Sequence, residues 1–181
     1  MIFDIGLLIG EGGQADVHLA RLRETGGLYA VKLLRECWDP IARQNFEREG
    51  MRQARVAGPH VVAVVAVNFA CDRPFIVLEY MPRGSLAKEM QGGPIPPTQA
   101  IAVVREVAIA LNQLHADGVV HRDVKPGNVL RASDGRLVLN DLGCAATTSF
   151  TDFVQTEGFV GTPAYAAPEQ RAGFASPCVP T

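Results

Sequence analysis

The densest group of chemically capable side chains lies in the string HRDVKPGNVL, residues 121–130. Within it, Asp123, Lys125 and Asn128 fall inside six residues. A carboxylate can accept a proton from a hydroxyl group, an ammonium group can neutralise a phosphoryl group, and an amide oxygen can ligate a divalent cation. A polar turn between a helix and a strand is the alternative, but it does not require so specific a string. The segment is therefore the first candidate for chemistry on phosphate groups.

A further acidic residue, Asp141, lies in the string NDLG. An isolated Asp-x-Gly is common in turns and says little alone. Asp141 follows Asn128 by 13 residues, however, across a predicted hairpin with strands at 128–130 and 137–139. The SDG turn between these strands would bring the two residues together, where an amide oxygen and a carboxylate could share a hard cation.

Glycines cluster in GEGGQADV, residues 10–17, between two predicted strands. Gly10, Gly12 and Gly13 would let backbone amides approach phosphate oxygens closely. Taken alone, the segment is explained equally well as a tight hairpin turn without a ligand. The sequence has no G-x-x-x-x-G-K-[ST] string, and the glycines lead into a strand rather than a helix. Both observations argue against a Walker-type or dinucleotide-binding site.

The predicted strand YAVK, residues 29–32, places Lys32, one of three lysines in the chain, among apolar neighbours. Burial of an amine is costly unless it meets an anion, although an edge-strand lysine can also extend outward into solvent. Because side chains alternate along a strand, Ala30 and Lys32 share one face. The small Ala30 would leave room beside the lysine for a ring and a phosphate.

The composition is that of an ordinary folded domain. The 181 residues are 48% hydrophobic and 20% charged with a net charge of −2, which argues against a disordered or strongly basic nucleic-acid-binding chain. The longest apolar run, residues 61–67, is shorter than the roughly 20 residues of a membrane helix, and the N-terminus lacks a secretion signal. Four scattered cysteines without a CxxC pair indicate reduced thiols. We therefore predict a cytoplasmic protein with no nucleic-acid partner and no membrane segment.

Apolar periodicity and turn residues predict the elements that must position these groups. Before the hairpin already described, strands are expected at residues 5–9, 17–22, 28–34, 61–69 and 74–79, and helices at 40–56, 85–90 and 97–116. In the first helix, Pro40 suits the first turn, and helical spacing relates Ile41, Asn45, Phe46 and Glu49. A cluster of prolines and glycines between Tyr80 and Thr98 predicts a hinge.

The helix at 97–116 is the most regular of the chain. Its predicted buried stripe consists of Ile101, Val104, Ala108, Leu111 and Leu114. Gly118 is predicted to end it as a C-cap, because glycine adopts the left-handed conformation that terminates helices.

A fifth motif, GTPAYAAPEQ at residues 161–170, follows the others. In this order and spacing, the five motifs resemble the eukaryotic-like protein kinase family from Ile9 to about Gln170. Lys125 and the GTPAY string resemble its serine/threonine branch, and the APEQ string resembles its bacterial members. The resemblance implies an α+β, two-lobe fold. Residues 1–80 would form a small antiparallel-sheet lobe with one helix, 81–97 the hinge and connecting segment, and 98–181 a partial helical lobe with the catalytic loop and activation segment.

The resemblance further implies that the chain binds ATP and Mg²⁺. Gly10, Gly12 and Gly13 would cover the phosphates, with Val17 over the adenine, and Lys32 would hold the α- and β-phosphates. The partner of Lys32 would be Glu49, with Glu47 as the neighbouring candidate. The remaining nucleotide contacts implied are Ala30 and Leu130 at the adenine pocket, Leu78 as gatekeeper, and the backbones of Glu79 and Met81 at the hinge.

For the chemical step, the resemblance implies that Asp123 is the catalytic base and that Lys125 contacts the γ-phosphate. Asn128 and Asp141 would bind magnesium, and Thr162 would brace Asp123. Arg122 would bind a phosphate on the activation loop, for which Thr156 is the first candidate phosphosite. Thr156 could equally be a solvated loop residue.

Three departures from the family pattern stand out. Leu142 replaces the usual aromatic residue after Asp141, which is a tolerated change. Gln53 is polar where an apolar residue is expected. After Glu169 only QRAGFASPCVPT remains, so the resemblance implies a catalytic domain truncated after the APE segment. In the family, the stretch that follows includes a buried aspartate that ties down the catalytic loop. The tail is expected to hold no substitute for the helix that should underlie His121 and Asp123. Loss of the base of the lobe would expose the helix at 97–116, which predicts instability or self-association.

Three functions are consistent with these observations. The leading hypothesis is a serine/threonine protein kinase that transfers the γ-phosphoryl group of ATP to hydroxyl groups of protein substrates. The second is an ATP-binding regulatory module, or an inactive kinase fragment, without catalysis. The third, a small-molecule phosphotransferase, shares the H-x-D-x-x-x-x-N loop, but the GTPAYAAPE string argues against it.

Overall fold

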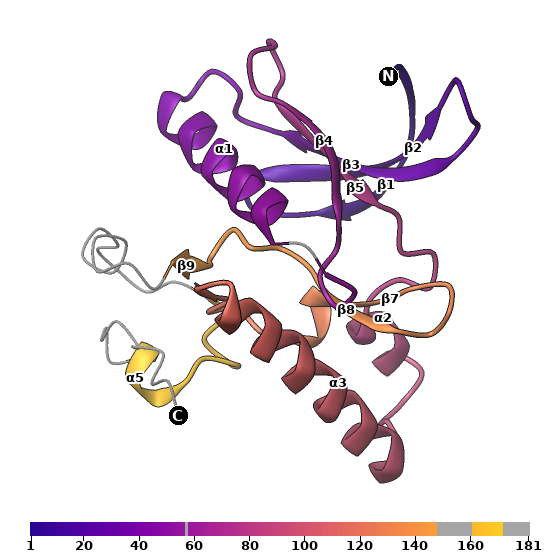
Figure 1. Ribbon diagram of the computed structural model, residues 1–181, viewed down its shortest axis with the longest axis vertical. Coiled ribbons are helices and arrows are strands. Elements are labelled where there is room, and N and C mark those ends of the chain that lie inside the picture. Colours follow the sequence, from indigo (N-terminus) through magenta and orange to yellow (C-terminus); the bar gives the residue numbers. More distant parts are fainter. Residues whose placement is uncertain (57, 148–160, 172–181) are drawn as a thin grey trace. The chain divides into compact units, whose positions relative to one another are not determined.

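A computed structural model describes residues 1–56, 58–147 and 161–171 (Figure 1). The chain divides into two compact units. Unit 1 comprises Met1–Ala57 and Val62–Pro82, and unit 2 comprises Gly58–Val61 and Arg83–Thr181. No helix within the described ranges combines the length and apolarity needed to cross a membrane.

Unit 1 is built on a five-stranded antiparallel sheet. In spatial order the strands are β1 (Phe3–Glu11), β2 (Ala15–Leu22), β3 (Leu28–Leu34), β5 (Phe75–Glu79) and β4 (Val64–Asn68). Ala20, Val31 and Val77 form a buried core cluster on this sheet. All five predicted strands are present. The strand expected at 61–69 is shorter because Val61 instead pairs with Leu139 in unit 2.

The helix of unit 1, α1 (Pro40–Arg55), begins at Asp39, whose carboxylate accepts hydrogen bonds from the main-chain N–H groups of Ile41 and Ala42. The helix is present as predicted. Of the residues that helical spacing relates, Phe46 and Glu49 are buried, whereas Ile41 is 69% exposed. The buried residues are Ala42, Phe46, Glu49, Gly50 and Gln53.

Glycine at position 50 allows α1 to approach the sheet closely. A Cβ atom there would lie 2.7 Å from the ring of Phe69 and 2.9 Å from Cδ1 of Ile76. The N-terminal half of the helix is fixed separately by the Arg43 guanidinium. It donates hydrogen bonds to the carbonyl oxygens of Cys37, Phe69, Cys71 and Asp72, at distances of 2.9–3.1 Å. We call this contact the Arg43 clamp.

Unit 2 contains the helices α2 (Leu86–Met90), α3 (Pro97–Ala116) and α5 (Pro168–Arg171). Gly118 follows α3 with a φ of 71°, as predicted for the residue that ends this helix. The predicted buried stripe is correct only at the C-terminal end. Leu114 is fully buried, whereas Ile101 and Val104 are 71% and 67% exposed.

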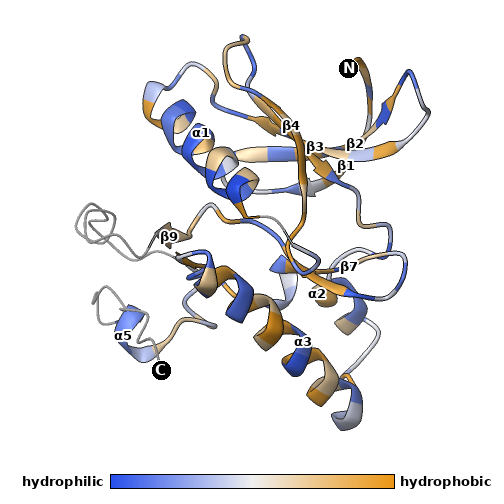
Figure 2. Ribbon diagram, in the orientation of Figure 1, coloured by the Kyte–Doolittle hydropathy of each residue, from blue (hydrophilic) through white to orange (hydrophobic). Residues whose placement is uncertain are grey.

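Packing explains this difference along α3. The helix packs against β6 (Val119–Val120), which follows it directly, and against β8 (Leu137–Leu139). Within the described residues, the apolar side chains of its first half have no comparable cover. Figure 2 shows hydrophobic residues in both halves of the helix, with hydrophilic residues between them.

Short elements of unit 2 surround the catalytic-loop motif. The 3₁₀ turn η1 (Pro126–Asn128) leads into β7 (Val129–Arg131), which pairs with β8 as the predicted hairpin. The strand β6 pairs with β9 (Ala146–Thr147). These two-residue strands and η1 were not predicted, because segments this short carry no periodicity.

Candidate functional site

In unit 1, Lys32 and Glu49 form an ion pair between the middle of β3 and the middle of α1. Their side chains are 15% and 7% exposed, so the pair is largely shielded from solvent. Glu47, the neighbouring candidate, is exposed. Helical geometry explains this difference, since residues two positions apart project from different sides of a helix.

The strand registers of unit 1 place several other predicted residues near this pair. Val17 lies opposite Lys32 on β2, and also opposite Gly10 on β1. Ala30 lies opposite Leu78 on β5. The glycine-rich segment forms a turn in which the N–H of Gly12 donates to the carbonyl of Ala15 at 2.9 Å.

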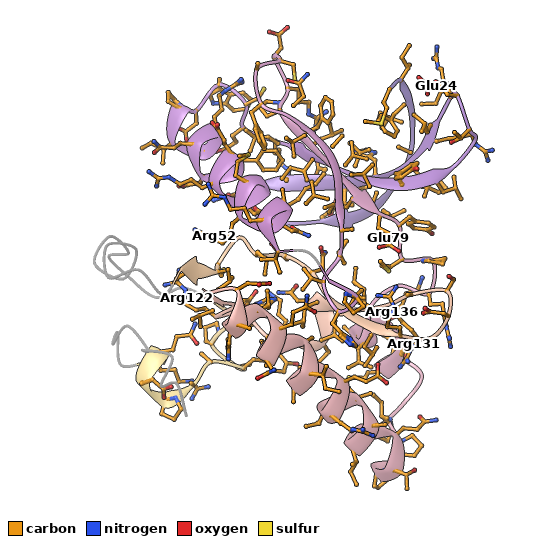
Figure 3. The ribbon with its side chains drawn as sticks, viewed as in Figure 1. Glu24, Arg52, Glu79, Arg122, Arg131 and Arg136 are labelled. Atoms are coloured by element: carbon orange, nitrogen blue, oxygen red, sulfur yellow. The ribbon has the colours of Figure 1, made fainter. Side chains whose placement is uncertain are left out.

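The predicted hinge residues follow on from β5. Leu78 and Met81 are buried, and Glu79, labelled in Figure 3, is exposed. The N–H of Glu79 donates to the carbonyl of Ala63 at 2.9 Å. The side chain of Leu78 therefore faces the interior, while the following residue keeps its side chain in solvent.

In unit 2, the carboxylate of Asp123 is the centre of a hydrogen-bond network. Its Oδ1 accepts from the hydroxyl of Thr162 at 2.7 Å. Its Oδ2 accepts from Nζ of Lys125 at 2.8 Å and from the amide of Asn128 at 3.0 Å. Lys125 also donates to the Thr162 hydroxyl at 2.8 Å, which joins the two sides of the network.

Four of the predicted catalytic-loop and activation-segment residues are thus brought together within unit 2. Asp123 and Asn128 are 7% and 6% exposed. The amide of Asn128 also donates to the main-chain carbonyl of Asp123, at 2.9 Å, and so closes the loop on itself. Thr162 lies 39 residues beyond Asp123 in the sequence. The network therefore joins two segments of unit 2 that are far apart along the chain.

The main chain before Asp123 has an unusual conformation. Arg122 has a φ of 61°, in the left-handed region that non-glycine residues rarely adopt, at a cost of about 1–3 kcal/mol. Its side chain, labelled in Figure 3, donates from Nε to the carbonyl of Cys144 at 2.6 Å. The adjacent segments of unit 2 therefore hold the loop in a conformation that it would not favour alone.

His121 supports the same loop from the interior. Its Nδ1 lies 3.3 Å from the main-chain nitrogen of Asp123, and its Nε2 lies 3.1 Å from the carbonyl oxygen of Asn140. A neutral ring that carries its proton on Nε2 satisfies both contacts. Burial is the main cause that lowers the pKa of His121 below its usual value, and hence favours this neutral form.

The hairpin of β7 and β8 positions Asp141 relative to Asn128. Val129 pairs with Leu139, and the main-chain N–H of Asn140 donates to the carbonyl of Asn128 at 2.9 Å. Asn128 and Asp141 therefore lie at the same end of the hairpin, as predicted. Asp141 also has a left-handed backbone, with a φ of 64°.

The residues flanking this end of the hairpin are mostly apolar. Leu142 is fully buried, which is consistent with an aliphatic side chain in place of an aromatic one. Leu130, the predicted adenine contact, is half-buried on β7 and forms a bridge with Ser85. Burial raises the pKa of the Cys144 thiol, which disfavours the reactive thiolate.

Two residues have roles that sequence reasoning missed. Gln53 is 1% exposed, and its amide donates to the carbonyl of Val62 at 3.1 Å, so a buried polar side chain is satisfied where an apolar one was expected. The amide of Gln170 donates to the carbonyl of Arg122 at 2.7 Å. This contact between the tail and the catalytic loop was not predicted. Thr156, the candidate phosphosite, lies outside the described residues.

Comparison with known proteins gives a consistent result. Residues 3–172 match the protein kinase domain family. The chain is 37% identical over 179 residues to the serine/threonine-protein kinase PknB of Mycobacterium leprae, covering 94% of this chain and 29% of that protein. It is 34% identical over 169 residues to a probable serine/threonine-protein kinase PknB of Lactococcus lactis, covering 91% of this chain and 27% of the relative.

A third relative, the serine/threonine-protein kinase PknE of Mycobacterium tuberculosis, is 34% identical over 166 residues, covering 90% of this chain and 29% of the relative. The chain thus spans less than a third of the length of these curated relatives. The antiparallel sheet with one helix in unit 1, and the helices of unit 2, agree with the α+β fold that the motifs implied. With a match that extends over residues 3–172, the chain belongs to the protein kinase domain family.

Proposed function

We propose that this chain is the catalytic part of a serine/threonine protein kinase, which transfers the γ-phosphoryl group of ATP to serine or threonine hydroxyls of protein substrates. The observation that carries the proposal is the network around Asp123 in unit 2. Lys125, Asn128 and Thr162 all donate to a single buried carboxylate. Donors from two segments that are far apart in the sequence fix the direction of this carboxylate, as a catalytic base requires.

Asp123 is proposed as the catalytic base. A carboxylate has about four lone-pair sites. Of these, Oδ2 uses two for Lys125 and Asn128, whereas Oδ1 uses one for Thr162. Counting the contacts of the described residues, Oδ1 keeps a lone-pair site for a substrate hydroxyl. In the reaction, a bond forms between the substrate oxygen and the γ-phosphorus, the bond to the β-phosphate oxygen breaks, and the hydroxyl proton passes to Asp123.

Lys125 and Thr162 would define the direction of this carboxylate and the charge around it. The ammonium group of Lys125 lies 2.8 Å from both Asp123 Oδ2 and the Thr162 hydroxyl. It can therefore neutralise a transferring phosphoryl group without leaving the network. Thr162 connects the activation segment to the base, which makes the position of Asp123 dependent on that segment.

Asn128 and Asp141 fit a magnesium site by the chemistry of their donor atoms. Mg²⁺ prefers oxygen ligands and commonly takes one or two carboxylates, with substrate phosphates and water completing its shell. Asp141 supplies a carboxylate and Asn128 an amide oxygen, at the same end of the β7–β8 hairpin. When bound, the cation would neutralise charge on the β- and γ-phosphates.

Unit 1 would contribute the remaining contacts to the nucleotide. Lys32, aligned by Glu49, is proposed to hold the α- and β-phosphates, and Gly10, Gly12 and Gly13 to cover the phosphates. The proposed adenine contacts of unit 1 are Val17 on β2, Ala30 on β3 and Leu78 on β5. Leu130 on β7 is a further proposed adenine contact. The backbones of Glu79 and Met81 are proposed to meet the adenine edge.

The test is phosphate transfer by the purified chain with Mg²⁺ and γ-labelled ATP. We expect autophosphorylation, or transfer to a generic protein substrate, and a loss of about 10²–10⁴-fold in Asp123→Asn, since the base is removed while the shape is kept. Asp117→Asn is the matched control, because Asp117 is an exposed residue just after α3. Thermal stabilisation by ATP without any transfer by the wild-type chain would contradict the proposal and favour the non-catalytic module.

A further inference from the structure

Three segments of unit 2 meet at the peptide group that precedes Asp123. The carbonyl of Arg122, which belongs to this peptide group, accepts a 2.7 Å hydrogen bond from Nε2 of Gln170 on α5. The contact lies directly beside the left-handed turn at Arg122. A hydrogen bond to this oxygen fixes the plane of the peptide from which the Asp123 side chain extends.

Gly161 shows how closely the segments pack. A Cβ atom at position 161 would lie 2.7 Å from the carbonyl oxygen of Arg122 and 2.7 Å from Nε2 of Gln170. It would also lie 3.7 Å from Oδ1 of Asp123. Gly161 has a φ of 115°, which favours glycine independently of space. The Gln170 amide therefore occupies volume that a side chain at position 161 would otherwise need.

The end of α5 is itself attached to the segment that carries Thr162. The Arg171 guanidinium donates to the carbonyl of Pro163 through Nε at 2.9 Å and Nη2 at 2.6 Å. A turn links Thr162 to Tyr165, whose N–H donates to the Thr162 carbonyl at 2.9 Å. Gln170 and Thr162 are thus held on one short piece of chain, and both contact the loop of Asp123.

We propose that Gln170 is a positioning residue for Asp123. Its amide holds the Arg122–Asp123 peptide from the main-chain side, while Thr162 holds the carboxylate from the side-chain side. The two contacts together transmit the position of residues 161–171 to the base. This inference rests on the proposed kinase activity, for which Asp123 is the base.

The chemistry of the contact requires a donor at position 170. The Arg122 carbonyl is an acceptor, so a glutamine amide suits it, whereas a glutamate carboxylate would place an acceptor against an acceptor. Glutamate has nearly the same size and shape as glutamine. The substitution Gln170→Glu therefore changes the hydrogen bond while it changes the packing very little.

The experiment compares kcat and KM of the wild type, Gln170→Glu and Gln170→Ala. We expect Gln170→Glu to lower kcat by about 10- to 100-fold, and Gln170→Ala by about 3- to 10-fold, with KM for ATP unchanged, because loss of the bond is milder than repulsion. Gln99→Glu is the matched control, as Gln99 is exposed in the first turn of α3. Wild-type kcat in both Gln170 variants would overturn the proposal.

The pH profile separates positioning from a merely structural role. A protonated glutamic acid can donate again, so the ratio of kcat in Gln170→Glu to wild-type kcat should rise as the pH falls from 7.5 to 5.5. The Asp123 carboxylate favours this protonation, because its Oδ1 and Nε2 of Gln170 would both lie within 4 Å of a Cβ atom at position 161. The ratio of kcat in Gln170→Ala to wild-type kcat should not change with pH. A flat ratio for Gln170→Glu would contradict the donor role.

Hydrogen exchange keeps the test independent of activity. Amides of residues 119–124 should exchange faster in Gln170→Ala and Gln170→Glu than in the wild type, and should be unchanged in Gln99→Glu. If the wild-type chain transfers no phosphate, the proposed function fails, but the exchange rates still show whether Gln170 fixes the loop. Equal exchange in all four chains would overturn the positioning role.

Discussion

The two units hold their charged side chains by different means. In unit 1, Lys32 and Glu49 project from the middle of a strand and the middle of a helix, so regular hydrogen bonding fixes their backbones. In unit 2, Asp123 and Lys125 lie on a loop whose shape depends on single side chains. His121, Asn128 and Gln170 each contact the main chain of that loop.

Because of this difference, we expect substitutions in unit 1 to affect the stability of the fold, and substitutions in unit 2 to affect the geometry of the loop that carries Asp123. A change to the pair of unit 1 leaves regular elements in place and alters the energy of a shielded charge. A change to an anchor of unit 2 releases a loop that already contains a left-handed residue, Arg122. We therefore expect substitutions in the Lys32–Glu49 pair to lower the free energy of unfolding, in addition to their effect on nucleotide binding. Unit 2 anchors should act mainly on the orientation of Asp123.

The largest expected effect on stability is that of Lys32→Met. Removal of one partner from a largely buried ion pair costs about 3–5 kcal/mol, and the 15% exposure of Lys32 places the expected loss near the lower end. Urea unfolding measures it. Lys88→Met is the matched control, since Lys88 is exposed on α2.

The double variant Lys32→Met/Glu49→Leu sharpens the same test. Apolar residues of similar volume commonly replace a buried ion pair without loss, so most of the stability should return while phosphate transfer does not. An unchanged unfolding free energy in Lys32→Met would show that the pair of unit 1 contributes geometry rather than stability, and would remove the contrast between the units.

An intermediate effect is expected from pH in unit 2. Burial lowers the pKa of His121, so the folded chain disfavours the charged ring. The resulting stability is fully present above the unfolded-state pKa of about 6.5, and it is lost as the pH falls through the lowered folded-state value. Thermal unfolding between pH 7.5 and 5 should show this loss.

A His121→Gln variant should flatten that dependence, whereas His115→Gln at the exposed end of α3 should keep it. Protonation of Nδ1 also removes the acceptor for the Asp123 N–H. The rate of phosphate transfer per molecule of bound nucleotide should therefore decline in the same pH range. If His121→Gln retains the full pH dependence, a different group causes it.

The smallest effect is expected at the ion pair between α2 and β7. Arg131, labelled in Figure 3, donates to both carboxylate oxygens of Glu89, at 2.6 and 3.0 Å, and lowers the pKa of that carboxyl. Partly exposed pairs of this kind contribute about 1 kcal/mol or less. Glu89→Gln should lower the unfolding free energy by that amount, against no change in Glu36→Gln. A loss above about 2 kcal/mol would mean that unit 2 also depends on its ion pairs for stability.

The same contrast explains what could be predicted from the sequence. The bounds of β3 and α3 agree with the predicted ranges, because strand composition and helical periodicity are local signals. The buried face of α3 was predicted incorrectly at Ile101 and Val104, because periodicity shows which residues share a face and not whether another element covers it.

The candidate site followed from motif strings rather than from periodicity. HRDVKPGN brought Asp123, Lys125 and Asn128 together in the sequence, and a hairpin prediction added Asp141. The roles of Gln53 and Gln170 could not be predicted, since each depends on a main-chain carbonyl outside its own helix. A glutamine that replaces an expected apolar residue was the one signal available for Gln53.

The Arg43 clamp has a consequence for the order of folding in unit 1. Three of its four carbonyl partners lie in the connection between β4 and β5, 26 to 29 residues beyond Arg43. Helices form in about a microsecond, but contacts between distant segments must wait for loop closure. We expect α1 to dock after that hairpin has formed, so that Arg43→Ala would speed unfolding and leave the folding rate almost unchanged in stopped-flow kinetics. The helix that carries Glu49 would then be among the last parts of the unit to reach its place.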